Sequence, residues 1–479
     1  MRNGDVYRFG SYELDSGSRL LYRGQEPIAL SRRHMTVLLQ LVANAGRVVP
    51  KKTLTDAAWD EEFVGDNSVE QVLSDLRKVL GLQPDGTPHI ETLNRRGYRF
   101  RAPVQRGRAR ESKEALDARL LPYLSFVDGR VALESLTIDA IPRALQVFGD
   151  LLPVMPDHPA PHLGMGNASF LAFESTRADV APDLAALQRA HHHAFEACQI
   201  DPESGDAWST RAIVLGRLGD GRGAYAAARR AVDIEPDNWL HWLRLATVSW
   251  GEESIRAAQR ASSLCPGLAF AEFFPARVYI ARQAFDPAIK HLRAGCAAQD
   301  AQRKEKGRFG GVGLHWLLAL VLGARGAHDE AFEELDRELA FEECGHVYAR
   351  ECAANSWYAI GALHHRLGRP EKAEPAFQEA LKRVPGHGLA TVGLSIVSGK
   401  VHRHAGRDDA TLVDAAMVKA AALAVQGKQD AAARVFCGPL TQAEPGAAGW
   451  LLPAEPLIHA TAHLDAWAPT LAILRDRAR

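Results

Sequence analysis

The stretches NSVEQVLSDLRKVLG (residues 67–81) and HIETLNRRGYRF (residues 89–100) decide the fold of the first part of this chain. At 100° per residue the apolar side chains of the first stretch share one stripe, which predicts a helix packed on one side against a core. They are Val69, Val72, Leu73, Leu76 and Leu80. Asn67 and Glu70 fit a capping box, so we expect the helix to begin at Asn67 or Ser68.

The opposite stripe of this helix carries polar and basic groups: Asn67, Gln71, Ser74 and Lys78, flanked by Glu70, Asp75 and Arg77. A DNA major groove accepts such a face, because amides and hydroxyls bond base edges while Arg and Lys meet phosphates. Any surface helix is also polar on its outer side, so the helix alone does not indicate DNA binding.

The second stretch predicts a two-stranded hairpin that turns at residues 94–97. Tyr98 and Phe100 alternate with Arg99, so one face packs and the other stays polar. Arg95 and Arg96 lie at the tip, where two cations are well placed for phosphates or a narrow minor groove. Helix and hairpin together favour a nucleic-acid-binding surface.

The residues before the helix complete a small α+β domain. Residues 5–30 predict short strands broken at glycines, and Val37, Leu38, Leu41 and Val42 then fall at helical spacing. A second short helix is expected from about Lys51 to Trp59. The order is therefore strands, three helices and a hairpin within about 100 residues.

This segment resembles the OmpR/PhoB-type winged helix-turn-helix domain, and more narrowly its ToxR/CadC/HilA branch of bacterial regulators. LSRRHMTVLLQLVANAGRVVPKKTL (residues 30–54) resembles the family's first two helices, NSVEQVLSDLRKVLG its recognition helix and HIETLNRRGYRF its wing. The resemblance covers residues 5–104, and we assign residues 1–104 to the domain.

The resemblance implies which side chains bind double-stranded DNA. The polar stripe and the family pattern together give Asn67, Ser68, Gln71, Ser74, Asp75, Arg77 and Lys78 on the recognition helix, and Thr92, Asn94, Arg95 and Arg96 on the wing. Trp59 matches a family tryptophan whose indole N–H can reach a phosphate, although core packing also explains it. One departure from the family is that Ser74 and Asp75 stand where many relatives carry basic residues. Asp75 would repel phosphate, so it either accepts from a cytosine amine or lies off the groove.

Residues 105–119 are polar and small and are expected to form a linker. Residues 120–479 then predict an all-α superhelix of tetratricopeptide repeats, although a chance helical bundle is an alternative. Two windows, residues 204–238 and 354–387, carry Trp, Gly, Ala and Pro at matching offsets. Pro202 and Pro236 lie 34 residues apart, the period of that repeat.

The distribution of charge along the chain agrees with a division into two parts. Residues 1–110 hold 18 Lys and Arg against 13 Asp and Glu, whereas the whole chain has a net charge of −1. A basic first part beside an acidic remainder suggests a polyanionic partner for the first part. The six cysteines form no C-x-x-C pair, and no secretory signal or membrane span is recognisable, so a cytoplasmic location is expected.

No metal, cofactor or enzymatic activity is predicted. His191, His192 and His193 point about 100° apart on a helix, and Cys344, His346 and Cys352 match no structural zinc spacing. Phosphate-loop, zinc-protease and nucleophile-elbow motifs are missing from the sequence.

The sequence thus predicts a DNA-binding transcription regulator that is not an enzyme. Its repeats would serve regulation, self-association as a homo-oligomer, or binding of a protein, peptide or small-molecule effector. The alternative is a tetratricopeptide scaffold whose winged helix binds protein instead of DNA.

Overall fold

The structure is a computed structural model that describes residues 5–59, 68–94, 96–108, 113–305, 309–402, 411–444 and 446–479. The chain divides into two compact units, Met1–Leu121 and Pro122–Arg479. Each unit is described separately below.

Among its described residues, the N-terminal unit contains two small antiparallel sheets, three complete helices and the beginning of a fourth. The five-stranded sheet has the order β4-β3-β2-β1-β8, and the three-stranded sheet has the order β5-β7-β6. The strands are β1 (Asp5–Phe9), β2 (Tyr12–Asp15), β3 (Leu20–Arg23), β4 (Glu26–Ile28), β5 (Val48–Val49), β6 (Ile90–Leu93), β7 (Gly97–Phe100) and β8 (Gln105–Arg108). The helices are α1 (Arg32–Ala43), α2 (Lys51–Ala58) and α3 (Ser68–Leu80).

The core of this unit lies between the helices and the sheets. The five apolar residues of the predicted stripe are the buried residues of α3, which confirms the helical-periodicity argument. They pack with Leu38 and Leu41 of α1 and with Phe100 of β7. The Tyr12 hydroxyl donates to the carbonyls of Val79 and Leu80, so β2 also fixes the end of α3.

The range expected to be a linker contains regular structure at both ends. Residues 105–108 form β8, which pairs antiparallel with β1, and α4 begins at Lys113. The sequence of β8, QRGR, has no apolar residue, so its pairing depends on backbone hydrogen bonds that hydropathy does not reveal.

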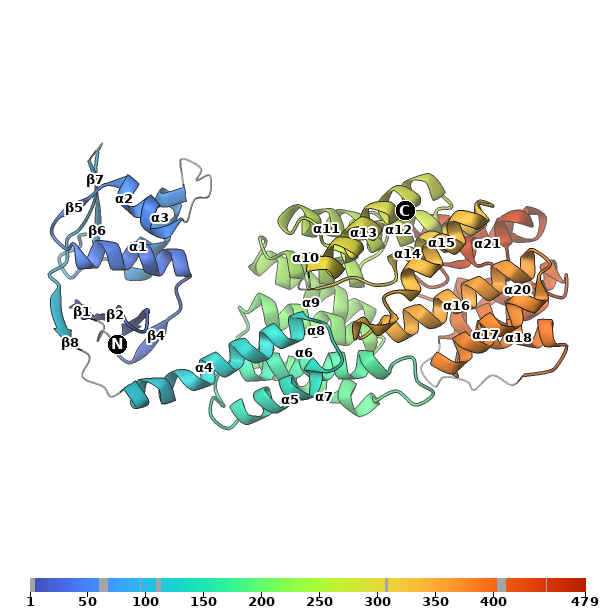
Figure 1. The fold of residues 1–479 in the computed structure, drawn as a ribbon, viewed down its shortest axis with the longest axis horizontal. Helices are drawn as coiled ribbons and strands as arrows, with labels where there is room; N and C mark the ends of the chain where they lie inside the picture. Colours follow the sequence, from blue (N-terminus) through green and yellow to red (C-terminus); the bar gives the residue numbers. More distant parts are fainter. Residues whose placement is uncertain are drawn as a thin grey trace. The chain divides into compact units, whose positions relative to one another are not determined.

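The second unit is a series of helical hairpins (Figure 1). The helix α4 (Lys113–Glu134) contains the boundary between the two units. The helices of the second unit then follow as α5 (Ala140–Leu151), α6 (Pro159–Thr176), α7 (Leu184–Ile200), α8 (Gly205–Arg217), α9 (Gly221–Ile234), α10 (Trp239–Val248), α11 (Gly251–Leu264), α12 (Ala269–Ala281) and α13 (Phe285–Glu305). They continue with α14 (Leu314–Ala324), α15 (His328–Leu339), η1 (Glu342–Cys344), α16 (Ala349–Arg366), α17 (Pro370–Arg383), α18 (Gly388–Ser398), α19 (Leu412–Ala424), α20 (Gln429–Gln442), η2 (Leu452–Ala454), η3 (Ala460–Ala462) and α21 (Leu464–Arg477).

Small residues allow the two helices of each hairpin to pack closely. Ala224 and Ala228 of α9 and Ala373 of α17 are fully buried where their helices contact the partner helix of the hairpin. A Cβ atom added at Gly361 of α16 would lie 2.8 Å from the Phe377 ring of α17. These contacts confirm the expected tetratricopeptide-type architecture.

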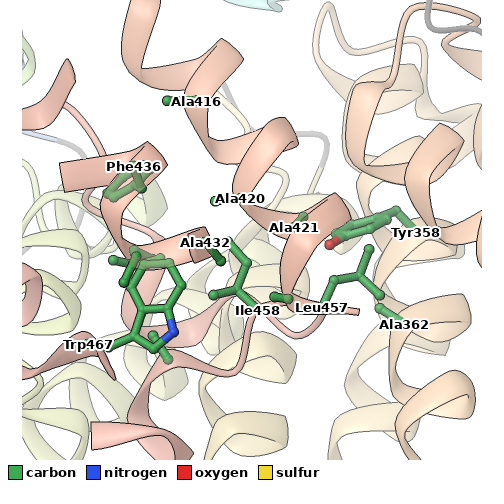
Figure 2. Close-up of a cluster of buried hydrophobic side chains, with 14 of the residues drawn as sticks. Tyr358, Ala362, Ala416, Ala420, Ala421, Ala432, Phe436, Leu457, Ile458 and Trp467 are labelled. Carbon is green, nitrogen blue, oxygen red and sulfur yellow. The ribbon is translucent and has the colours of Figure 1, made fainter. Parts of the chain in front are cut away.

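A segment without α-helix crosses the face formed by the first helices of several hairpins. We call residues 450–460 the C-terminal strap. Its η2 turn packs on α12 and α14, while Leu457 and Ile458 lie between Tyr358 of α16 and the α19–α20 hairpin (Figure 2). The sequence leads us to expect a protein or peptide partner in a groove of the repeats, and that expectation stays a prediction. The structure shows the chain's own strap against α12, α14 and α16.

Two further contacts fix the strap and the end of the chain. The Tyr358 hydroxyl donates to the buried Glu455 carboxylate. After the strap, α21 turns back so that the Ala478 carbonyl accepts from Arg282 at the end of α12. Among the described residues, no helix is long and apolar enough to span a membrane.

Candidate nucleic-acid interface

The outer face of α3 carries the polar side chains that the sequence predicts. Gln71 and Lys78 are exposed, and Ser68, Ser74 and Asp75 are partly exposed. Asn67, predicted at the start of this helix, lies outside the described residues. The apolar stripe of α3 is buried in the core, so the polar side chains on the opposite side of the helix face solvent.

Asp75 connects three polar side chains on this face. Its carboxylate accepts from Gln71 Nε2 at 3.3 Å and Lys78 Nζ at 3.2 Å, and His34 Nε2 of α1 lies 3.6 Å away. The hydrogen bonds from Lys78 and Gln71 lower the pKa of Asp75, so the carboxylate stays ionised. Asp75 therefore orients Gln71 and Lys78 and offsets part of the positive charge of the face.

Arg77 joins the helix to the wing. Its Nε donates to the Ile90 carbonyl at 3.0 Å, and its Nη2 donates to Thr92 Oγ1 at 2.6 Å, both on β6. Two residues predicted to contact DNA are thus brought together as a brace. The brace fixes the position of the wing relative to α3.

The wing is the β6–β7 hairpin, with Asn94 and Arg96 exposed near its tip. Arg95 lies outside the described residues. Gly97 has φ +125°, and a Cβ atom there would lie 2.2 Å from the Val49 carbonyl oxygen of β5. Only glycine therefore lets β7 approach β5 at this position.

Trp59 lies at the end of α2 and is 8% exposed within the hydrophobic core. The Arg33 guanidinium lies 5.9 Å from its ring centroid. The structure thus shows packing for Trp59, and its predicted phosphate contact remains a prediction.

Sequence periodicity did not identify two polar contacts behind the interface. Lys51 Nζ of α2 lies 2.8 Å from Glu70 Oε1, and the Tyr98 hydroxyl donates to the same oxygen at 3.3 Å. Burial raises the pKa of Glu70, but the hydrogen bond and charge of Lys51 outweigh this effect and lower it. These residues join α2, α3 and β7, and their separation along the chain leaves no local pattern.

Comparison with known families divides the chain in the same way as the fold. Residues 24–100 match the family described as "Transcriptional regulatory protein, C terminal", and residues 354–387 match the tetratricopeptide repeat. The class that fold and surface define is a winged-helix domain joined to helical repeats. More particularly, the N-terminal unit contains a domain that matches the OmpR/PhoB-type family of DNA-binding domains.

Several relatives share this domain. The transcriptional regulator HilA of Salmonella typhi is 32% identical over 96 residues, which are 20% of this chain and 17% of HilA. The regulatory protein QseB of Escherichia coli O157:H7 is 37% identical over 93 residues, which are 19% of this chain and 40% of QseB. The solved DNA-binding domain of Escherichia coli CadC is 27% identical with a TM-score of 0.20, covering 22% of this chain and 98% of that one. The chain spans less than half the length of HilA and of QseB.

Proposed function

We propose that this protein is a sequence-specific DNA-binding transcription regulator that places α3 in the major groove and the β6–β7 wing on the minor groove. The observation that carries the proposal is the Arg77 brace to Ile90 and Thr92 within an OmpR/PhoB-type domain. It holds a polar helix face and a cationic hairpin tip as one unit. Recognition then divides between base edges, reached from α3, and phosphates, reached from both elements.

Gln71 is the side chain best suited to read a base, since it is exposed on α3 and its amide can bond an adenine edge in two places. Asp75 holds this amide weakly, at 3.3–3.4 Å, so a base can replace the contact. Lys78 and Arg96 are exposed cations that supply phosphate contacts in this proposal.

The test is selection of preferred duplexes from a random pool by the full chain and by Gln71→Ala. The variant is expected to lose discrimination at one base position, by about 1–3 kcal/mol for a lost bidentate pair. Gln105→Ala, an exposed glutamine of β8, is the control and should select the same sequences as the parent. An unchanged preference for Gln71→Ala would refute its role as a base reader.

We further propose that residues 120–479 regulate this DNA-binding activity through a partner or through self-association. The match of residues 354–387 to a tetratricopeptide repeat supports a binding role for the repeats. Because the strap covers the face at α12, α14 and α16, a partner would use another surface or displace the strap. In a reporter assay, deletion of residues 120–479 should alter promoter control without changing the preferred DNA sequence. Unaltered control would exclude the regulatory role.

A further inference from the structure

Three helices of the second unit bring a thiol, an imidazole and a carboxylate together. Cys296 of α13, His315 of α14 and Glu334 of α15 each offer one ligand atom, and these atoms lie within 4.8 Å of one another. All three residues are buried, and the His315 side chain is 1% exposed. The residues lie 19 positions apart in both steps, so no short sequence motif marks the group.

The His315 ring is held between two carboxylates. Its Nδ1 lies 2.5 Å from Glu334 Oε2, and its Nε2 lies 3.3 Å from Asp300 Oδ1. Metal-bound histidines are characteristically arranged in this way, with one ring nitrogen on the ion and the other donating to a carboxylate. Asp300 would thus be the orienting partner, while Nδ1 faces Glu334.

The backbone around the ring is fixed by a fourth side chain. Glu338 of α15 accepts from the backbone N–H of Gly313 at 2.7 Å and of His315 at 3.1 Å. It therefore caps the first turn of α14 and keeps His315 at the meeting point of the three helices. This carboxylate is already satisfied by donors, so we do not count it as a ligand.

We propose that Cys296 Sγ, His315 Nδ1 and Glu334 Oε2 form a binding site for a divalent transition-metal ion of the zinc class. A set of one sulfur, one nitrogen and one oxygen suits zinc, which accepts all three donor types. When the doubly charged ion binds, two protons leave. One is the proton of the Cys296 thiol, and the other is the proton shared by His315 Nδ1 and Glu334 Oε2. The net charge of the buried group is then unchanged, so the ion adds no uncompensated charge to the interior.

Ion binding requires the three ligand atoms, which lie within 4.8 Å of one another, to adjust their spacing. Ligand atoms on a tetrahedral zinc ion lie about 3.3–3.6 Å apart, given metal–ligand distances of about 2.0–2.3 Å. Nδ1 and Oε2 must therefore separate by about 1 Å. The Asp300 side chain is 48% exposed, so the outer side of the ring, at Nε2, lies near solvent.

A second group, Asp206, Glu235 and His241, also has converging ligand atoms but offers no sulfur. Glu235 there accepts from Gly205 N and Asn238 Nδ2, so that group has a structural role. The sulfur is what distinguishes the two groups in an experiment.

The test uses the full chain, stripped with a chelator and titrated with Co²⁺, which replaces zinc and reports its ligands by absorption. We expect one ion per chain with a thiolate-to-cobalt charge-transfer band in the near ultraviolet. Cys296→Ser should abolish the band. Cys198→Ser, at a cysteine that is equally buried, is the control and should keep it.

Asp300→Asn tests the orienting role at a half-exposed position where folding should be unaffected. It should weaken Co²⁺ affinity about 10–100-fold while leaving the stoichiometry and the charge-transfer band unchanged. The proposal is overturned if the parent chain shows no charge-transfer band, if Cys296→Ser retains it, or if Asp300→Asn binds as tightly as the parent.

Discussion

Arg77 differs from the other cations of the proposed interface because its guanidinium already has two partners on β6, the Ile90 carbonyl and Thr92. Its position on the polar stripe follows from helical spacing, whereas its partners follow from how the hairpin folds back. Arg77 therefore acts first by holding the wing, and any phosphate contact depends on that position. The same holds for Asp75, which organises neighbours that periodicity alone leaves unconnected.

Replacing Gly97 with Ala should unfold the wing. The added Cβ atom would meet the Val49 carbonyl at 2.2 Å, in a backbone conformation that favours glycine. We expect a loss of about 1–3 kcal/mol in the stability of the N-terminal unit, measured by denaturant unfolding. Gly107→Ala is the matched control, because its nearest neighbour is an arginine side chain 3.7 Å away. Equal stability of both variants would contradict this role of Gly97.

Replacing Glu455 with Gln should change the pH dependence of the second unit. Burial raises the pKa of Glu455 to about 7 from 4.5, so the folded chain holds this proton more tightly than the unfolded chain. Its contribution to stability is therefore complete below pH 4.5 and is lost as the pH rises to about 7. The loss amounts to about 3 kcal/mol.

Glu455→Gln should accordingly be more stable than the parent at pH 8 and lack the decline between pH 4.5 and 7. Denaturant titrations across this range measure both effects. Glu444→Gln, an exchange outside the strap, is the control. A decline that persists unchanged in Glu455→Gln would show that another group causes it.

At the scale of elements, the sequence predicted the helices whose apolar residues recur at helical spacing. It did not predict the segments that are held by residues far away in the sequence. The stripe of α3 and the Ala-rich hairpins follow from periodicity, and both are confirmed. β8 was missed because QRGR has no apolar residue and is held by its ladder to β1 and by the Arg106–Asp5 ion pair, which joins residues far apart in sequence. The strap was missed because Pro453 and Pro456 give its sequence the pattern of a surface loop. Its apolar side chains are nevertheless buried, by helices that lie elsewhere in the sequence.

The candidate interface was predictable to the same extent. The exposed face of α3 and the wing could be located from the sequence. The Arg77–Thr92 contact, the approach of His34 to Asp75 and the Lys51–Glu70 pair could not, since each joins separate elements. Which of these residues touch DNA stays a prediction.

Ala373→Trp should disrupt the repeat formed by α16 and α17. Ala373 is fully buried where the two helices meet, so a large side chain overpacks the contact at a cost of about 1–3 kcal/mol or more. Gln378→Trp places the same side chain on the exposed face of α17 and should be tolerated. Thermal unfolding of the two variants distinguishes them, and similar melting temperatures would contradict close packing at Ala373.

At the scale of the whole molecule, residues 1–110 carry a net positive charge and the remainder carries a net negative charge. The domain family and the polar helix–wing surface favour DNA as the partner of the first part. The repeats, the strap and the proposed metal site all lie in the second part.

The most direct test of the central claim is the salt dependence of duplex DNA binding by the full chain. Binding should weaken steeply with salt, because Lys and Arg release counterions from phosphates. Arg95→Ala/Arg96→Ala should weaken binding to all sequences and reduce the slope by about one to two phosphate contacts. Arg222→Ala/Arg434→Ala, with the same charge change on the repeats, should match the parent. Absence of DNA binding even at low salt, or a wing variant with unchanged affinity and slope, would contradict the account.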